Sequence, residues 1–250
     1  YPELKNIPVI IGESDPEGCA ACQGPQNAYR NGTMYSSYTA AVFARKHDLA
    51  DAHAINLEGA VTWAFTFEDQ PWFAGFRQIA SNGVPMAVFN VFRMYSQMGT
   101  ERVNATSSGQ VELADIVAKG VRGQADVGVL ASRSANKVTI MVWHYHDDDV
   151  PGPDAAVSLA LAGLPETLAK ARLTHHRIDQ NHSNAYAEWL RMGSPVAPDP
   201  KQYAVLEAAS NLTPLENTPA EITVANGTAK LEFVLPRQGV SLVTVEWSGK

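Results

Sequence analysis

Basic charge, cysteine and long apolar runs are all scarce in these 250 residues. Lysine and arginine total 19 against 26 aspartates and glutamates, so the formal net charge is −7. No basic stripe occurs, and nucleic acid is therefore not an expected partner. No apolar run approaches the roughly 20 residues that a membrane helix needs, so no membrane span is expected. No basic segment followed by an apolar one opens the sequence, and no signal peptide is visible.

The two cysteines, Cys19 and Cys22, form a C-A-A-C motif in a loop rich in glycine and proline. A structural zinc site needs a second ligand pair, and none follows. A thioredoxin-like motif opens a helix of a βαβ unit, which this loop does not. The motif indicates a structural loop, free or bridged, with redox and metal pairs as weaker alternatives. The acidic run Asp147–Asp149 indicates a solvated turn, so no metal or other cofactor is expected.

Two β/α units are predicted in the first hundred residues. Residues 7–11 form an apolar, β-branched run typical of a buried parallel strand. A loop follows, and Ser36 or Ser37 is expected to cap a helix ending near residue 54. Residues 60–67 predict a second strand. Pro85 is well placed to open a second helix, which Gly99 ends.

From about residue 103 the sequence indicates short strands and a β-sandwich. Asn226-Gly227 is the strongest hairpin signal, between strands expected at 221–224 and 229–235. The other expected strands are 126–132, 137–145, 155–161, 171–178 and 240–247, and short helices are expected at 184–192 and 200–210.

The expected organisation leaves the first region incomplete. A polar stretch near residues 100–108 divides the chain into 1–102 and 103–250. Two parallel β/α units cannot form a closed sheet. A complete (β/α)8 barrel needs about 250 residues for itself, more than this region contains. Their apolar edges would stay bare, so more of the same chain or a second chain is expected to complete the fold.

Several stretches resemble glycoside hydrolase family 39, which contains β-xylosidases and α-L-iduronidases. Four stretches resemble the end of its catalytic barrel: P-V-I-I-G-E, W-A-F-T-F-E-D, F-A-G-F and V-F-N-V-F-R-M. A later stretch, R-I-D-Q-N-H-S-N-A-Y, resembles the segment beside its C-terminal sandwich. The resemblance implies an α/β plus all-β fold. Residues 1–102 would be the seventh and eighth units of a (β/α)8 TIM barrel, and 103–250 a β-sandwich. The bacterial β-xylosidases fit best. The family's Asn-Glu-Pro acid/base motif does not occur here.

Four residues are predicted to form the site. Active sites of these barrels lie at the C-terminal ends of the strands, where Glu13 follows residues 7–11. The resemblance implies that Glu13 is the nucleophile, against the alternative of a surface glutamate, and that Trp63 lies in the substrate pocket and not in the barrel core. Glu68 and Asp69 are expected to bind sugar hydroxyls, with the choice between them open. Asp15 is expected to be a turn residue.

The predicted function is retaining exo-hydrolysis of β-1,4-xylosidic bonds, which releases xylose from xylo-oligosaccharides. The missing barrel half is the expected partner, and a homo-oligomer is compatible with it. Residues 1–250 alone are expected to be inactive without the acid/base. The alternatives are α-L-iduronidase or arabinosidase specificity, or a non-catalytic sugar-binding sandwich. The last requires exposed aromatic residues such as Trp143, Tyr145 or Trp247, but these lie within expected strands and are expected to pack inward. The compartment is left open between bacterial cytoplasm and periplasm.

Overall fold

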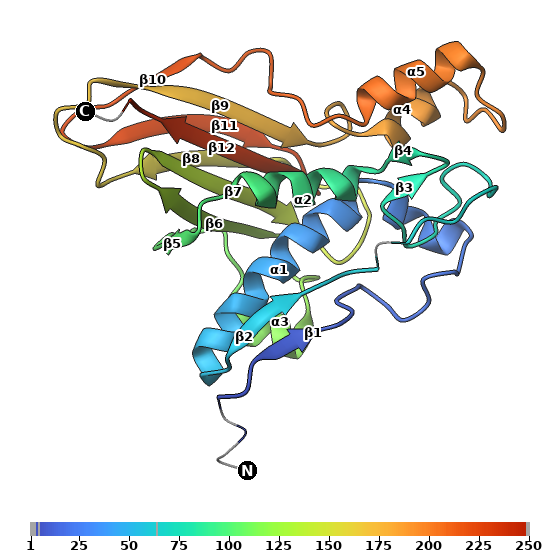
Figure 1. The fold of residues 1–250 in the computed structure, drawn as a ribbon, viewed down its shortest axis with the longest axis horizontal. Helices are drawn as coiled ribbons and strands as arrows, with labels where there is room; N and C mark the ends of the chain where they lie inside the picture. The colour runs from blue at the N-terminus through green and yellow to red at the C-terminus, as the bar shows by residue number, and fades with distance from the viewer. Residues whose placement is uncertain (1–3, 5, 64, 249–250) are drawn as a thin grey trace.

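The computed structural model describes residues 4, 6–63 and 65–248. Helices and short strands alternate in the first hundred residues, and strands dominate the remainder (Figure 1). The elements in chain order are β1 (Val9–Ile11), the 3-10 helix η2 (Pro25–Asn31), α1 (Thr33–His53), β2 (Leu57–Ala60), β3 (Ala80–Ser81), β4 (Val84–Pro85), α2 (Ala87–Gln97), β5 (Glu101–Val103), α3 (Leu113–Lys119), β6 (Asp126–Ser134), β7 (Lys137–Tyr145), β8 (Ala155–Leu161), β9 (Lys170–Ile178), α4 (Ala185–Arg191), α5 (Pro200–Ala209), β10 (Glu221–Thr223), β11 (Ala229–Leu235) and β12 (Val240–Glu246). Within the described ranges, no helix is both long and apolar enough to cross a membrane.

The first two strands form a small parallel pair. Val9 of β1 aligns with Leu57 of β2, and α1 connects the strands, which confirms a parallel β/α unit. The prediction of a strand over residues 60–67 is wrong, because β2 ends at Ala60. β1 is only three residues long, so it offers no partner for a longer β2. Residue 64 of the expected strand lies outside the described residues.

Helix α1 begins before the serines that were expected to cap it. Its first residue is Thr33, after an extended Gly32, and η2 occupies part of the expected loop. Ser36 and Ser37 are therefore helical and fully buried. The Ser37 hydroxyl lies 2.6 Å from Oε1 of Gln238, so this serine serves a tertiary contact and not a cap.

The second helix also begins later than its proline predicts. Pro85 pairs with Ala80 in the short hairpin β3–β4 and does not open α2. Met86 is extended and precedes the helix, which ends at Gln97, two residues before the expected stop at Gly99. Pairing with a neighbouring strand therefore decides the conformation of Pro85, although its fixed φ also suits a first helical turn.

Six strands form one antiparallel sheet in the order β10-β9-β12-β7-β6-β5. β12 is seven residues long and pairs along its whole length with both β7 and β9. Helices α1 and α2 cover one face of this sheet and lie between it and the β1–β2 pair (Figure 1). Strands β7, β8 and β11 have the expected bounds.

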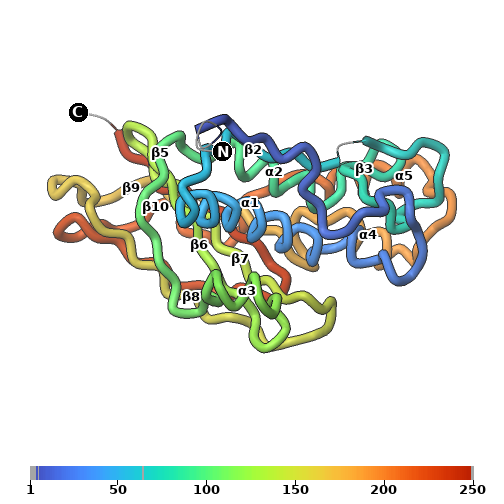
Figure 2. Tube along the Cα trace, turned by 90° about the horizontal axis from the view of Figure 1, so that it is seen from below, coloured from blue at the N-terminus to red at the C-terminus, as the bar shows by residue number. Residues whose placement is uncertain are grey.

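The other face of the sheet packs on the two-stranded antiparallel sheet β11–β8. Ile140 and Val243 of the large sheet share one apolar cluster with Leu161 and Leu235 of the small one. Helices α4 and α5 extend from one end of the molecule, opposite the end that carries β5 and the C-terminus (Figure 2). Residues beyond 100 thus build a two-layer β structure against the helices.

The Asn226-Gly227 turn forms, but it does not join a paired hairpin. Both residues have positive φ, and Ala225 bridges Thr228 across the turn. β10 nevertheless pairs with β9, while β11 pairs with β8, so the turn carries the chain from one sheet to the other. A Cβ at Gly227 would lie 2.8 Å from the carbonyl oxygen of Leu164, which explains why glycine occupies this crossing.

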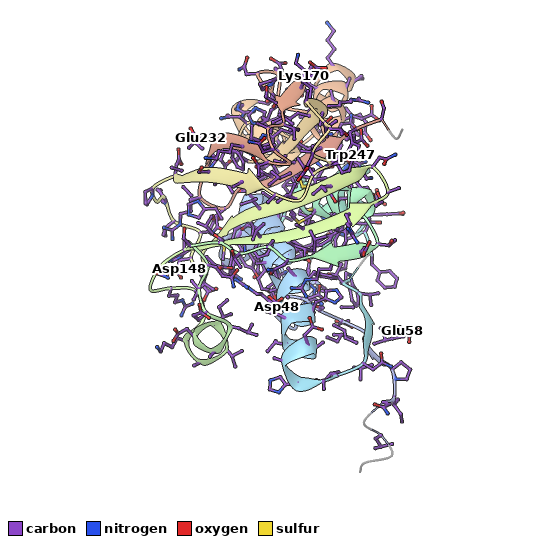
Figure 3. All side chains as sticks on the ribbon, turned by 90° about the vertical axis from the view of Figure 1, so that its left-hand side faces the viewer. Asp48, Glu58, Asp148, Lys170, Glu232 and Trp247 are labelled. Atoms are coloured by element: carbon purple, nitrogen blue, oxygen red, sulfur yellow. A yellow bond between two sulfur atoms is a disulfide. The ribbon has the colours of Figure 1, made fainter. Side chains whose placement is uncertain are left out.

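Two of the three aromatic residues considered for a sugar-binding sandwich lie in the core. Trp143 is 1% exposed and Tyr145 is 7% exposed, and both face the cluster beneath α1 and α2. Trp247 is half-buried beside the other cluster and appears at the molecule's edge in Figure 3. The expectation that Trp143 and Tyr145 pack inward is therefore confirmed, and neither offers the exposed platform that a sugar-binding sandwich needs.

A buried carboxylate joins the helical layer to the large sheet. Asp126, at the start of β6, accepts hydrogen bonds from Arg45 Nη2 (2.8 Å), Trp143 Nε1 (2.8 Å) and the backbone N–H of Val111 (2.8 Å). Arg45 comes from α1, and its guanidinium also lies 5.6 Å from the Trp143 ring centroid. One carboxylate thus connects α1, β6, β7 and the loop before α3.

Replacing Arg45 with alanine is expected to lower the free energy of unfolding by about 3–5 kcal/mol, because it strands a buried carboxylate. Arg102→Ala is the matched control, since Arg102 forms ion pairs with Asp48 and Asp51 at the surface. That control should cost less than about 1 kcal/mol. Urea unfolding of the intact protein measures both, and equal costs would contradict the role assigned to Asp126.

A second buried polar group lies on β9. His175 Nε2 is 2.9 Å from the Ser241 hydroxyl, which also accepts a hydrogen bond from Arg177 Nε at 2.7 Å. Burial, and secondly the nearby Arg177 charge, lower the pKa of His175 to about 3. The folded protein therefore holds this imidazole neutral and hydrogen-bonded to the Ser241 hydroxyl.

Between about pH 6.5, where an unfolded histidine titrates, and pH 3, only the unfolded chain protonates His175. Stability should therefore fall as pH falls through this window, by up to about 1.4 kcal/mol per pH unit. His175→Gln should remove this contribution to the slope of unfolding free energy against pH, whereas the exposed His47→Gln should not. Identical slopes for both variants would refute the assignment.

Candidate active site

Glu13 lies just beyond β1, at the strand's C-terminal end. Gly12 separates it from the last strand residue, Ile11. Its side chain is 59% exposed, and one carboxylate oxygen, Oε2, lies 3.2 Å from Nη2 of Arg77. One oxygen is therefore held by a cation while the carboxylate as a whole remains open to solvent. This arrangement suits a carboxylate that must reach a ligand.

Arg77 is the residue around which the candidate site is arranged, and sequence reasoning missed it. Its side chain is 1% exposed, and Nη2 lies 3.3 Å from Asp15 Oδ2 as well as close to Glu13. Nη1 donates to the carbonyl oxygen of Glu17, and the Arg77 backbone N–H donates to Ala20 O at 3.0 Å. A guanidinium stays charged at all relevant pH values, so Arg77 balances two carboxylates permanently.

Asp15 is buried, not solvated. Its side chain is 3% exposed and accepts hydrogen bonds from the Thr62 hydroxyl and, at 3.4 Å, from the backbone N–H of Trp63. These contacts connect the loop after β1 to the segment after β2. Because Arg77 and two donors already engage it, Asp15 fixes the positions of its neighbours. Asp15 lies in the loop where it was predicted, but the prediction did not anticipate that its side chain is buried.

Trp63 lies beside the arginine. The Arg77 guanidinium is 5.9 Å from the centroid of its ring, and the Phe65 ring is 4.8 Å away on a tilted plane. Its indole N–H is buried and has no hydrogen-bond acceptor among the residues that the structure describes. An unsatisfied indole donor costs free energy unless a ligand or another segment of the protein accepts it.

Glu68 and Asp69 lie on an exposed loop. Phe67 anchors this loop, because its ring stacks on Phe76 at 4.6 Å and its backbone N–H donates to Gln78 Oε1 at 3.1 Å. Asp69 has a positive φ of 54°. Within the described ranges, no hydrogen bond or ion pair joins either carboxylate to Glu13 or Arg77. Their predicted contact with sugar hydroxyls stays a prediction.

A disulfide and a second buried arginine stabilise the loop that carries Glu13. Cys19 and Cys22 are bonded, with Cα atoms 5.4 Å apart. Arg30 donates to the carbonyl oxygens of Cys22 (2.9 Å), Cys19 (3.0 Å) and Gly75 (3.0 Å), and it forms an ion pair with Glu17. The loop is therefore fixed on both sides of the disulfide. The spacing of the cysteines alone could not distinguish a bridge from free thiols.

The described residues contain no group of three or more histidine, cysteine, aspartate or glutamate side chains placed to hold a metal ion. Glu13 therefore offers a carboxylate beside a fixed cation and an indole.

Comparison with known proteins identifies the family of the chain. The family model described as "Glycosyl hydrolases family 39" matches residues 1–228. The chain is similar to a bacterial orthologue of human α-L-iduronidase, with a TM-score of 0.79 and 16% identity over 99% of this chain and 43% of that one. The chain is also similar to a GH39 enzyme from Xanthomonas axonopodis pv. citri, with a TM-score of 0.68 and 15% identity over 92% of this chain and 44% of that one. A monomeric β-xylosidase from Caulobacter crescentus CB15 matches with a TM-score of 0.66 and 15% identity, over 92% of this chain and 44% of that one.

The chain thus spans less than half the length of these solved structures. At such identities the structural likeness establishes the fold, that of TIM-barrel glycosidases with additional sheets. The family match covers most of the chain and includes Glu13, Trp63 and Arg77. The chain therefore belongs to glycosyl hydrolase family 39, the glycosidase family that its sequence motifs resemble.

Proposed function

We propose that the intact protein is a retaining exo-glycosidase that releases xylose from xylo-oligosaccharides by cleaving β-1,4 bonds. The observation that carries this proposal is the placement of Glu13 at the C-terminal end of β1, with one oxygen on buried Arg77. A carboxylate held in this way has one oxygen oriented and the other available for attack. Trp63 supplies an indole face and an N–H donor that no described residue accepts, and both suit a pyranose.

Glu13 would attack the anomeric carbon and displace the leaving-group oxygen, which forms a covalent glycosyl-enzyme. Water would then hydrolyse this ester and restore the carboxylate. Arg77 keeps the Glu13 carboxylate in place through both steps. It also balances the negative charge that Glu13 regains when the ester is hydrolysed. A second carboxyl group must protonate the leaving oxygen and then activate the water. We assign that group to a part of the protein outside residues 1–250.

We further propose that residues 1–102 are the last two β/α units of a barrel and that residues 103–250 form a β-sandwich behind them. Apolar side chains on and beside β1 and β2 support this, because they are unusually open to solvent: Ile10 is 63% exposed, Val61 52% and Phe65 67%. A monomer rarely leaves such a patch uncovered. The remaining barrel strands are its proposed partner, and the sandwich supports the barrel through α1 and α2.

Iduronidase and arabinosidase activities are the alternatives on this scaffold, and the iduronidase orthologue has the highest TM-score of the three structures described. A uronic acid needs a cation free to bind its carboxylate. Arg77, the cation next to Glu13, is already paired with both Glu13 and Asp15. This pairing favours a neutral sugar. Comparing hydrolysis of aryl β-xyloside, α-L-iduronide and α-L-arabinoside tests the choice, and preferential iduronide cleavage would overturn it.

Glu13→Ala should abolish hydrolysis of an aryl β-xyloside by the intact protein, and added azide should restore part of the turnover by replacing the missing nucleophile. Glu166→Ala is the control, since Glu166 is an exposed glutamate in a turn of the β-rich region. Steady-state rates with and without azide measure both variants. An unchanged rate in Glu13→Ala would exclude this residue as the nucleophile.

Arg77→Met should lower kcat/KM by about 10²-fold, because removing the cation leaves Glu13 unoriented and Asp15 buried without its partner. Arg77→Lys retains the charge but cannot contact both carboxylates in the same fork, so it should recover only part of the loss. The exposed Arg172→Met serves as the control. Equal activity of the lysine and methionine variants would show that Arg77 acts by filling space and not by charge.

A further inference from the structure

A preformed cavity of about 700 Å³ lies next to the loop that carries Glu13. One wall comes from Pro16, the 3-10 helix η2 and the first turns of α1. The other comes from the loop after β7, residues 147–150, and from Arg122. This loop reaches the outer edge of the molecule at Asp148 in Figure 3. The volume is within the range of small-ligand sites.

The two walls are connected by one buried side chain, Gln238. Its Oε1 accepts a hydrogen bond from the Ser37 hydroxyl of α1 at 2.6 Å. Its Nε2 donates to the carbonyl oxygens of His146 (2.8 Å) and Asp148 (3.2 Å) on the opposite loop. The loop is therefore held at a fixed distance from α1. A cavity held open in this way costs little ordering when a ligand binds.

Aromatic side chains form the floor of the cavity. The rings of Tyr38 and Tyr145 meet edge to face at 5.9 Å, and Tyr29 and Met34 flank them. Burial raises the pKa of Tyr38 to about 12, so its hydroxyl stays protonated and can both donate and accept hydrogen bonds. Rings that combine apolar faces with hydroxyl groups match the alternating C–H and O–H surface of a sugar.

The charged groups of the cavity favour a neutral ligand. Three carboxylates, Asp147, Asp148 and Asp149, line it with one cation, Arg122. Arg122 is already occupied, because its Nε lies 3.4 Å from Asp148 Oδ1. Asp147 accepts the Val121 backbone N–H at 2.6 Å, which fixes its orientation. Such acceptors bind hydroxyl donors and repel phosphates, uronates and other anions.

The cavity and the nucleophile share one loop. Pro16 lines the cavity three residues after Glu13, and Asp15, held by Arg77, lies between them in sequence. Tyr29, on the cavity wall, donates its hydroxyl to Glu17 of the same loop. An exo-acting hydrolase holds one sugar at its nucleophile, so the rest of the substrate extends on the leaving-group side. A sugar site beside this loop must therefore bind that side.

We infer that this cavity is a leaving-group subsite for the distal xylose units of a xylo-oligosaccharide. The inference rests on the proposed function and deepens it, because it assigns selection of longer chains to the β7–β8 loop together with η2. Short aryl glycosides do not reach the cavity, whereas a tetrasaccharide does.

The test compares kcat/KM for xylotetraose with kcat/KM for an aryl β-xyloside in the intact protein. Tyr38→Phe combined with Asp148→Asn removes a hydroxyl and a carboxylate, and should lower this ratio at least about tenfold. Ala28→Trp fills the cavity without removing a polar group and should lower it as well. Asp115→Asn, an exposed acid on α3 away from the cavity, should leave the ratio unchanged.

An unchanged ratio in both cavity variants would overturn the subsite. Failure of the wild-type protein to cleave any xyloside would instead refute the proposed function. In that case calorimetry shows whether the cavity binds xylotetraose. Tighter binding by the wild type than by both variants supports a sugar site in the cavity, and equal binding refutes it.

Discussion

The carboxylate of Asp126 is the interaction on which the arrangement of this protein depends. It is buried at the start of β6, and it is satisfied only when α1, β7 and the loop before α3 each supply a donor. A buried charge without such partners is strongly destabilising, so these elements must assemble together. Helix α1 follows η2 and the Glu13 loop directly, and its position on the sheet therefore sets where that loop lies.

A second constraint acts within the loop itself. Arg30 and Arg77 are both buried, and between them they bind backbone carbonyl oxygens on both sides of the Cys19–Cys22 disulfide. Arg77 also contacts Glu13 and Asp15. Buried guanidinium groups with several fixed acceptors allow little movement, so they hold the Glu13 carboxylate and the loop beside it in one arrangement. Rigidity at the site is thus a consequence of charge burial and not of regular secondary structure.

Features determined by local sequence could be predicted, and those determined by distant contacts could not. β7, β8 and β11 have their expected bounds because their apolar patterns and turns are local, and the place of Glu13 just after a strand was predicted in the same way. Arg77 lies 64 residues from Glu13 in sequence, and no local pattern shows that they meet. The pairing of β10 with β9, and not with β11 across the Asn226-Gly227 turn, and the strand pairing of Pro85 likewise depend on neighbours supplied by tertiary structure.

The most direct test of Glu13 as the nucleophile is to trap its covalent intermediate. The intact protein would be incubated with a 2-deoxy-2-fluoro-xyloside carrying a good leaving group, digested, and analysed by peptide mass spectrometry. We expect one fluoro-xylosyl adduct, on Glu13 in the peptide that follows β1, with activity lost in proportion to labelling. An adduct on any other residue, or complete inactivation without an adduct on Glu13, would contradict this expectation.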